Sequence, residues 1–128
     1  MEIPSRSEAW SLDPLLLPYP PSVNRYWRYA NGRAYVTAEG KSYKAAVLQC
    51  VGRRPSPIAD RVAIAINVYP PDRRARDIDN LLKALLDALT NAGVWVDDEQ
   101  VDRIEIERRE VVKGGALMVL ISRYEGAT

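Results

Sequence analysis

The chain has 128 residues, of which 47% are hydrophobic, and carries a formal net charge of +1. This size and composition predict one folded domain and exclude intrinsic disorder. Histidine is absent and cysteine occurs once, which excludes Ser-His-Asp and Cys-His catalysis, histidine zinc motifs and an internal disulfide. Any bound metal must therefore be held largely by oxygen ligands, which favours Mg²⁺ or Mn²⁺ over zinc.

Charge is distributed unevenly along the chain. Residues 14–76 contain 11 lysines and arginines against 3 acidic residues, whereas residues 77–110 contain 10 acidic residues against 4 basic ones. Phosphate binding depends on the local charge of a surface and not on the net charge of the protein. The basic segment is therefore compatible with nucleic-acid binding, and the acidic segment supplies candidate metal ligands.

The first 13 residues are predicted to form a flexible arm, and residues 14–128 the folded domain. The polar start, "MEIPSRSEAW", lacks the apolar region of a signal peptide. No apolar run approaches the roughly 20 residues that span a bilayer. We therefore expect a cytoplasmic protein that makes no membrane contact.

The first half of the domain predicts a short strand, an aromatic turn and a helix. "LLLP" begins as a strand that ends at the proline. "SVNRYWRYANGRAYV" predicts a polar, aromatic loop or an irregular hairpin with Asn31 and Gly32 as its turn. Thr37 can cap a helix over residues 38–51, on which apolar residues recur at helical spacing and Cys50 is expected to be buried.

The second half predicts three strands and a strongly apolar helix. "RVAIAINVY" alternates as a strand with one apolar face. Residues 77–91 predict a helix with an apolar arc of about 200°, which Gly93 ends. "VDRIEIERREVV" and "ALMVLISRY" predict a hairpin joined by Lys-Gly-Gly. The expected fold is a single compact α/β (α+β) domain, with a small mixed sheet of about four strands and two main helices.

The stretch "RRARDIDNLLKALLDAL" places acids at the start of the predicted helix. Asp77 and Asp79 can converge on one metal ion if this junction is not helical, and either Asp97 or Asp98, after the next turn, could return toward them. Lys83 lies four residues after Asp79 and could stabilise charge on a phosphate. The alternatives are that Asp77 caps the helix, that Asp79 and Lys83 form a surface pair, and that Asp97-Asp98 is an ordinary turn.

A basic and aromatic loop, "NRYWRYANGR", and the arginine run before the acids predict nucleic-acid contacts. Arginine with exposed aromatic rings suits phosphate binding and stacking on unpaired bases. The alternatives are that the aromatic residues close the core and that the arginines belong to a solvated loop. The candidate DNA-binding residues are Asn24, Arg25, Arg28, Arg73, Arg74, Arg76 and Asn80.

Three ordered segments, "PPSVNRYWRYANGRAYVTAEGKSY", "PPDRRARDIDNLLKALLDAL" and "AGVWVDDEQV", resemble the RusA family of Holliday junction resolvases. With "VVKGG" they cover nearly the whole chain after residue 17. The resemblance implies a RusA-like fold and a bacterial or phage endonuclease that resolves four-way DNA junctions by paired, symmetric nicks, using Mg²⁺. It places the essential acids and metal ligands on Asp77, Asp79 and Asp98, and the essential lysine on Lys83.

The resemblance also implies a homodimer, because a four-way junction has two-fold symmetry and paired cuts need two active sites. The apolar arc of the second helix, or an edge strand, could supply the interface. Two other functions stay open at this point. One is a junction-binding protein without catalysis, and the other is a metal nuclease that cuts flaps or replication forks.

Overall fold

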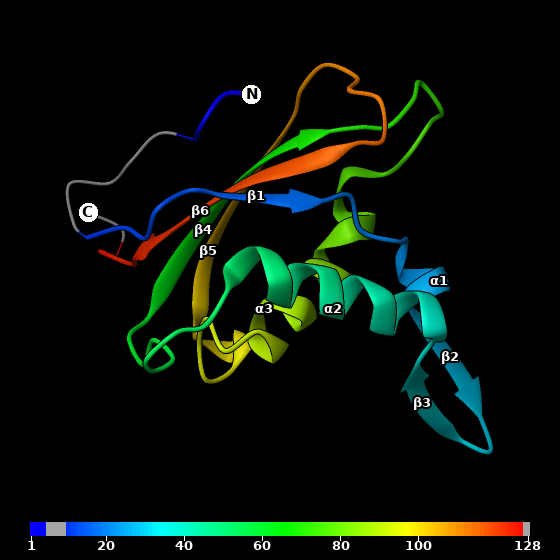
Figure 1. Cartoon of the computed structure of the whole chain (residues 1–128), viewed down its shortest axis with the longest axis horizontal. Helices are drawn as coiled ribbons and strands as arrows, with labels where there is room; N and C mark the ends of the chain where they lie inside the picture. Colours follow the sequence, from blue (N-terminus) through cyan, green and yellow to red (C-terminus); the bar gives the residue numbers. More distant parts are fainter. Residues whose placement is uncertain (5–9, 127–128) are drawn as a thin grey trace.

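A four-stranded sheet forms the centre of the molecule, and two helices pack on one of its faces (Figure 1). The computed structural model describes residues 1–4 and 10–126, and no helix in that part is long and apolar enough to cross a membrane. The strand order is β1-β6-β4-β5. The strands are β1 (Leu15–Pro18), β4 (Val62–Tyr69), β5 (Val101–Arg108) and β6 (Ala116–Arg123). This arrangement confirms the predicted fold class.

Strand β4 is the central strand of the core. It runs parallel to β5 and antiparallel to β6. Its alternation is as predicted, and four apolar side chains are almost completely buried against the helices: Val62, Ile64, Ile66 and Val68. Strand β5 has β4 on one side and forms the free edge of the sheet.

The predicted hairpin between the last two strands is wrong. Strands β5 and β6 flank β4 instead of pairing with each other. Their connection crosses the end of β4, where the backbone N–H groups of Arg109 and Val112 donate to the carbonyls of Val68 (2.7 Å) and Pro70 (2.9 Å). Gly115 has φ +70°, and a Cβ there would lie 2.9 Å from Tyr19. The Gly-Gly pair therefore permits a tight crossing over β4, whereas the sequence pattern suggested a hairpin turn.

Helix α2 (Ala38–Val51) has the predicted bounds and the predicted cap. The hydroxyl of Thr37 accepts a hydrogen bond from the N–H of Gly40 at 3.0 Å. Tyr43 and Val47 are buried as expected. Cys50 was expected to be buried but is exposed, because it lies to one side of the apolar stripe.

Helix α3 (Leu82–Asn91) begins later than predicted. A 3-10 turn, η1 (Ile78–Leu81), precedes it, so the acids at residues 77 and 79 lie before the α-helix. The apolar arc packs into the core, where Leu85 and Leu89 are fully buried. Gly93 has φ +78° and ends the helix as predicted.

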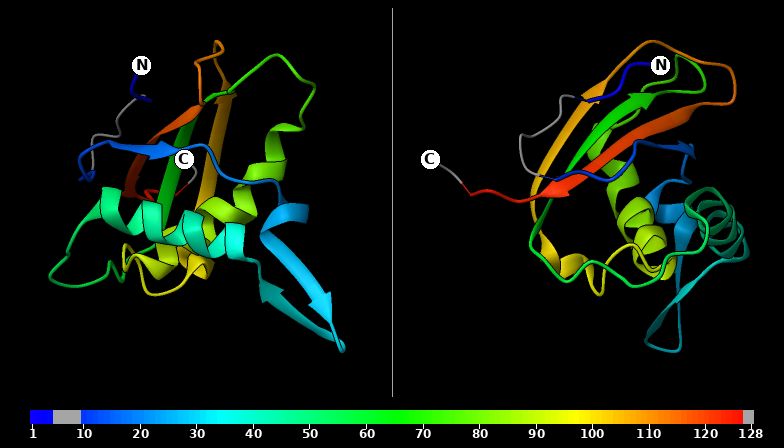
Figure 2. Two further views of the ribbon diagram at one scale, coloured as in Figure 1. Left: turned by 45° about the vertical axis from the view of Figure 1, so that its right-hand side comes forward. Right: turned by 60° about the vertical axis from the view of Figure 1, so that its left-hand side comes forward.

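The aromatic segment forms a hairpin that extends away from the body of the molecule (Figure 2). It consists of β2 (Trp27–Ala30) and β3 (Arg33–Val36). Asn31 and Gly32 form the turn, with φ of 53° and 74°, as the primed hairpin turns require. A short helix that the sequence did not predict, α1 (Val23–Tyr26), precedes the hairpin.

The described parts of the predicted N-terminal arm contact the sheet. The carbonyl of Glu2 accepts a hydrogen bond from the side chain of Asn67 at 2.9 Å, and the N–H of Leu12 donates to the carbonyl of Ile121 at 2.9 Å. Residues 5–9 of this arm lie outside the described residues. The flexibility of residues 1–13 stays a prediction.

Candidate nucleic-acid interface and acidic site

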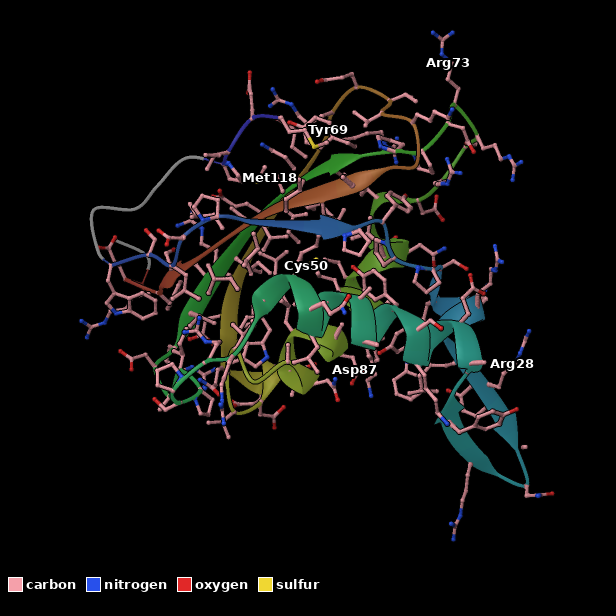
Figure 3. The ribbon with its side chains drawn as sticks, viewed as in Figure 1. Arg28, Cys50, Tyr69, Arg73, Asp87 and Met118 are labelled. Atoms are coloured by element: carbon pink, nitrogen blue, oxygen red, sulfur yellow. The ribbon has the colours of Figure 1, made fainter. Side chains whose placement is uncertain are left out.

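The loop after β4 holds its arginines through one aspartate. The carboxylate of Asp72 accepts from the N–H of Arg74 at 2.9 Å and pairs with the guanidinium of Arg76 at 2.8 Å. The contact with Arg76, aided by the N–H of Arg74, lowers the pKa of Asp72 to about 2. Arg76 also lies over the ring of Tyr19, 5.9 Å from its centre. Arg73 projects outward from the edge of the loop (Figure 3).

Asp77 does not cap the helix with its side chain. Its backbone is extended (φ −75°, ψ 132°), and among the described residues its carboxylate accepts no capping hydrogen bond. Only its backbone carbonyl takes part, accepting from the N–H of Asn80 at 3.2 Å. The capping alternative therefore fails for the side chain. Because Asp77 and Asp79 are both exposed, their oxygens are accessible to a ligand.

Asp77 lines a hollow of about 520 Å³ together with cationic side chains. We name this the arginine hollow, and its polar lining includes Arg25, Arg74, Arg76 and Asn80. These residues come from α1, the loop after β4 and η1. The fold thus brings together four of the predicted DNA-binding residues with one of the predicted metal ligands.

Lys83 faces a second hollow, of about 850 Å³, between α3 and the hairpin. We name this the hairpin hollow, and it is lined by Val23, Asn24, Trp27, Arg28, Tyr29, Ala34 and Lys83. Helix α1 contributes to both hollows, since Asn24 lines the hairpin hollow and Arg25 the arginine hollow. All the predicted DNA-binding residues except Arg73 therefore divide between two adjoining hollows.

The turn after α3 assigns different roles to its two aspartates. Asp97 caps a 3-10 turn, η2 (Asp98–Gln100), in a capping box. The side chain of Gln100 accepts from the N–H groups of Val96 and Asp97, each at 2.9 Å. The indole of Trp95 donates to the hydroxyl of Thr90 at 2.7 Å. The ordinary-turn alternative therefore holds for Asp97, while Asp98 stays exposed beside it.

Asp98 lies near Lys83, the residue four positions after Asp79. Desolvation raises the pKa of Asp98, and the hydrogen bond and charge of Asp97 add to this, whereas the charge of Lys83 lowers it. A further contribution to its raised pKa comes from Asp87. Among the described residues, no group of three or more acidic or cysteine side chains could hold a metal ion. The set of three metal ligands therefore stays a prediction.

The sequence did not point to the role of Asp87. Its carboxylate accepts a hydrogen bond from the hydroxyl of Tyr26 and pairs with Lys44 at 3.4 Å, and Figure 3 places it beside α2 and α3. Burial raises the pKa of Tyr26, and the bond to Asp87 raises it further. Asp87 thereby joins α1 and α2 to α3, which fixes Asn24 relative to Lys83. Its partners are distant in sequence, so no local pattern predicts the cluster.

The fold and the site define a small mixed α+β protein that places an exposed aspartate, Asp77, in an arginine-lined hollow. Comparison with known proteins gives the family. A family model described as Endodeoxyribonuclease RusA matches residues 18–121. The protein named Crossover junction endodeoxyribonuclease RusA from Escherichia coli strain K12 is 46% identical over 110 residues, which cover 84% of this chain and 92% of that protein. The chain belongs to the RusA family, which confirms the resemblance seen in the sequence.

Relatives of the same name occur in other bacteria and in a phage. The proteins from Shigella sonnei and Enterobacteria phage 82 are each 44% identical over 110 residues and have the same coverage. The similarity therefore spans most of the folded domain, including both hollows and the turn that carries Asp98.

Proposed function

We propose that the protein is an endonuclease that resolves four-way DNA junctions by paired, symmetric nicks, in DNA recombination and repair. The observation that carries this proposal is the position of Asp77, exposed and without a side-chain cap, in a hollow lined by three arginines. Membership of a family whose relatives are named crossover junction endodeoxyribonucleases supports the reaction type. The bacterial and phage relatives also support action in the cytoplasm of a bacterial cell.

The proposed metal is Mg²⁺, with Mn²⁺ as a possible substitute, held by Asp77, Asp79 and Asp98. The donors fit this group, since they are all exposed carboxylates and oxygen ligands suit hard divalent cations. When bound, the metal would lower the pKa of a water and offset charge on the scissile phosphate. Lys83, exposed at the edge of the hairpin hollow, would stabilise the same developing charge.

Phosphate contacts would come from arginines and asparagines of both hollows. Arg73 and Arg74 project from the loop that Asp72 holds, whereas Arg76 also has a structural role in that loop. Arg25, Arg28, Asn24 and Asn80 extend the surface to α1, the hairpin and η1. Junction affinity is therefore expected to fall as salt rises.

The protein would act as a homodimer joined through the free edge of the sheet. Strand β5 is an edge strand of eight residues, and Ile104 on it is 41% exposed. Arg103 and Glu105 flank Ile104 and pair with each other within one chain at 2.9 Å, and each side chain is 59% exposed. In an antiparallel pair of two β5 strands centred on Ile104, Arg103 of one chain lies opposite Glu105 of the other. Such opposite-charge pairs favour this register.

This pairing would also bring acids of the two chains toward each other. In this pairing, the first residues of β5, which follow Asp98, would lie beside the last residues of the partner's β5. In each chain, the guanidinium of Arg108 at the end of β5 donates to the carbonyl of Arg76 at 2.5 Å, and Arg76 directly precedes Asp77. The partner's Asp98 would thus approach Asp77 and Asp79. Two copies would form two sites related by a two-fold axis, as paired nicks require.

The function is tested on labelled four-way junction, linear duplex, flap and fork substrates, with Mg²⁺ or with EDTA. We expect symmetric nicks in the junction alone, lost with EDTA. Junction binding without cleavage in Mg²⁺ or Mn²⁺ would identify a binding protein and contradict the enzyme proposal. Preferred cleavage of flaps or forks would support a nuclease activity but contradict the proposal that four-way junctions are its substrate. Denatured protein and the duplex substrate serve as controls for contaminating nucleases.

A further inference from the structure

The hairpin has two chemically different faces. Trp27 pairs with Val36, and Tyr29 with Ala34. Because alternate residues of a strand share a face, these four side chains form one apolar, aromatic face. The opposite face carries Arg28 and Tyr35, which pair with each other. The aromatic face opens into the hairpin hollow, since Trp27, Tyr29 and Ala34 all line it.

Tyr29 is unusually exposed for an aromatic residue on this face. Its ring is 81% exposed, compared with 48% for Tyr35 on the other face. The indole nitrogen of Trp27 is buried and has no hydrogen-bond partner within the described residues. Trp27 itself packs against the core and against the ring of Tyr26. Tyr29 is therefore the aromatic side chain of this face that is open to a ligand.

The base of the hairpin is held firmly while its tip is free of the body. The hydroxyl of Thr37 donates to the carbonyl of Arg25 at 2.6 Å, and the N–H of Thr37 donates to the carbonyl of Tyr26 at 3.0 Å. A Cβ on Gly40 would lie 2.6 Å from Val36 and 2.9 Å from the carbonyl of Tyr26, so α2 and the hairpin base pack closely. Figure 2 shows the tip standing clear of the sheet and helices.

The polar groups at the rim of the hollow match a nucleotide. Lys83 and Asn24 lie at the edge of the aromatic face, and they offer a cation and an amide for a phosphate or a base edge. The hollow, about 850 Å³, has the size of pockets that bind small molecules. An apolar aromatic platform with a cationic rim is the arrangement by which proteins bind unstacked bases.

We propose that the hairpin hollow takes one unstacked base of the junction, which stacks on Tyr29 while its phosphate lies near Lys83. This inference rests on the proposed function, because it assumes DNA as the ligand. Bases at a strand crossover can leave the stack at lower cost than bases inside a duplex. The hollow would therefore favour junctions over duplex, and it would place the backbone of the unstacked nucleotide beside the proposed lysine.

The test compares Tyr29→Ala, Tyr29→Phe and Tyr35→Ala in EDTA, where DNA is bound but not cut. Stacking of one base on an aromatic ring predicts a loss of about tenfold in junction affinity for Tyr29→Ala, with duplex affinity unchanged. Tyr29→Phe keeps the ring and should bind as the unchanged protein does. Tyr35→Ala is the matched control on the opposite face and should have no effect on the junction-to-duplex ratio.

A second readout locates the base directly. A junction with 5-iodouracil at the crossover is irradiated in the complex, and the cross-linked peptide is identified by mass spectrometry. We expect a cross-link on Tyr29, absent in Tyr29→Ala. Suppose that the protein binds and cuts junctions, that Tyr29→Ala keeps its preference for junctions, and that no cross-link forms on the hairpin. The base-binding proposal is then wrong, whereas the proposed nuclease function is not affected. If the unchanged protein has no preference for junctions, the proposed function and this inference both fail.

Discussion

Asp79→Asn is expected to lower junction cleavage by about 10³-fold while junction affinity is unchanged or slightly higher. The substitution keeps the size of the side chain and removes a charge that we assign to metal binding. Metal ligation supplies several kcal/mol of transition-state stabilisation, and each 1.36 kcal/mol corresponds to a factor of ten in rate. Affinity should survive because the proposed phosphate contacts come from the arginines and not from this exposed carboxylate.

Cleavage rates in Mg²⁺ and affinities in EDTA measure the two effects separately. Asp13→Asn is the matched control, because Asp13 is an exposed carboxylate just before β1, at the sheet edge opposite β5, and has no place in the proposed site or interface. It should cut junctions at close to the normal rate. If Asp79→Asn lost affinity as steeply as cleavage with its fold intact, the carboxylate would be structural and its assignment to metal binding would be wrong.

Arg103→Glu is expected to weaken the dimer and, with it, junction cleavage. In the proposed pairing, the change replaces two opposite-charge pairs by two like-charge pairs across the two-fold axis. At about 1 kcal/mol for each pair, the dissociation constant of the dimer should rise roughly 30-fold. Because cleavage would need both copies, its rate should fall at protein concentrations where the unchanged protein is still dimeric.

The double variant Arg103→Glu, Glu105→Arg tests whether the dimer weakens because this specific pairing is lost or only because the charge of β5 has changed. It restores an opposite-charge pair at both positions, so its dimer should recover. Analytical ultracentrifugation gives the mass of each variant, and circular dichroism checks that each monomer is folded. Equal dissociation of the single and double variants, or an unchanged protein that is monomeric at all concentrations, would contradict the edge-strand interface.

Local patterns in the sequence predicted several elements of the fold correctly. The cap at Thr37, the alternation in β4 and the turn at Asn31 and Gly32 are each decided by residues close together in the chain. Such features depend on backbone preferences and on one buried face, so a short segment contains most of the information. The predicted bounds of α2 were therefore correct.

Elements that depend on distant partners were predicted less well. Alternation in β5 and β6 identified both strands, but it does not say which strand lies beside which, and β4 lies between them. The 3-10 turn before α3 was missed because, over only four residues, a 3-10 turn and the first turn of an α-helix give similar spacings of apolar residues. The contacts of Asp87 join residues 43 and 61 positions away, which no local pattern reports.

Each nuclease site is proposed to combine Asp77 and Asp79 of one chain with the partner's Asp98. Mixing two inactive variants tests this composition of the site. Asp79→Asn and Asp98→Asn are expressed together with different tags, and the mixed dimers are isolated. In such a dimer one site carries both changes and the other carries neither. We therefore predict that mixed dimers nick the junction on one strand, although each variant alone is inactive.

A mixture of Asp77→Asn with Asp79→Asn is the control, since both changes fall in the same part of the site and every site in the mixed dimer then contains one of them. It should stay inactive. We expect single-strand nicking for the Asp79 and Asp98 mixture alone. If mixed dimers of these two variants form and bind the junction but cut no better than either variant by itself, the site belongs to a single chain and the account is contradicted.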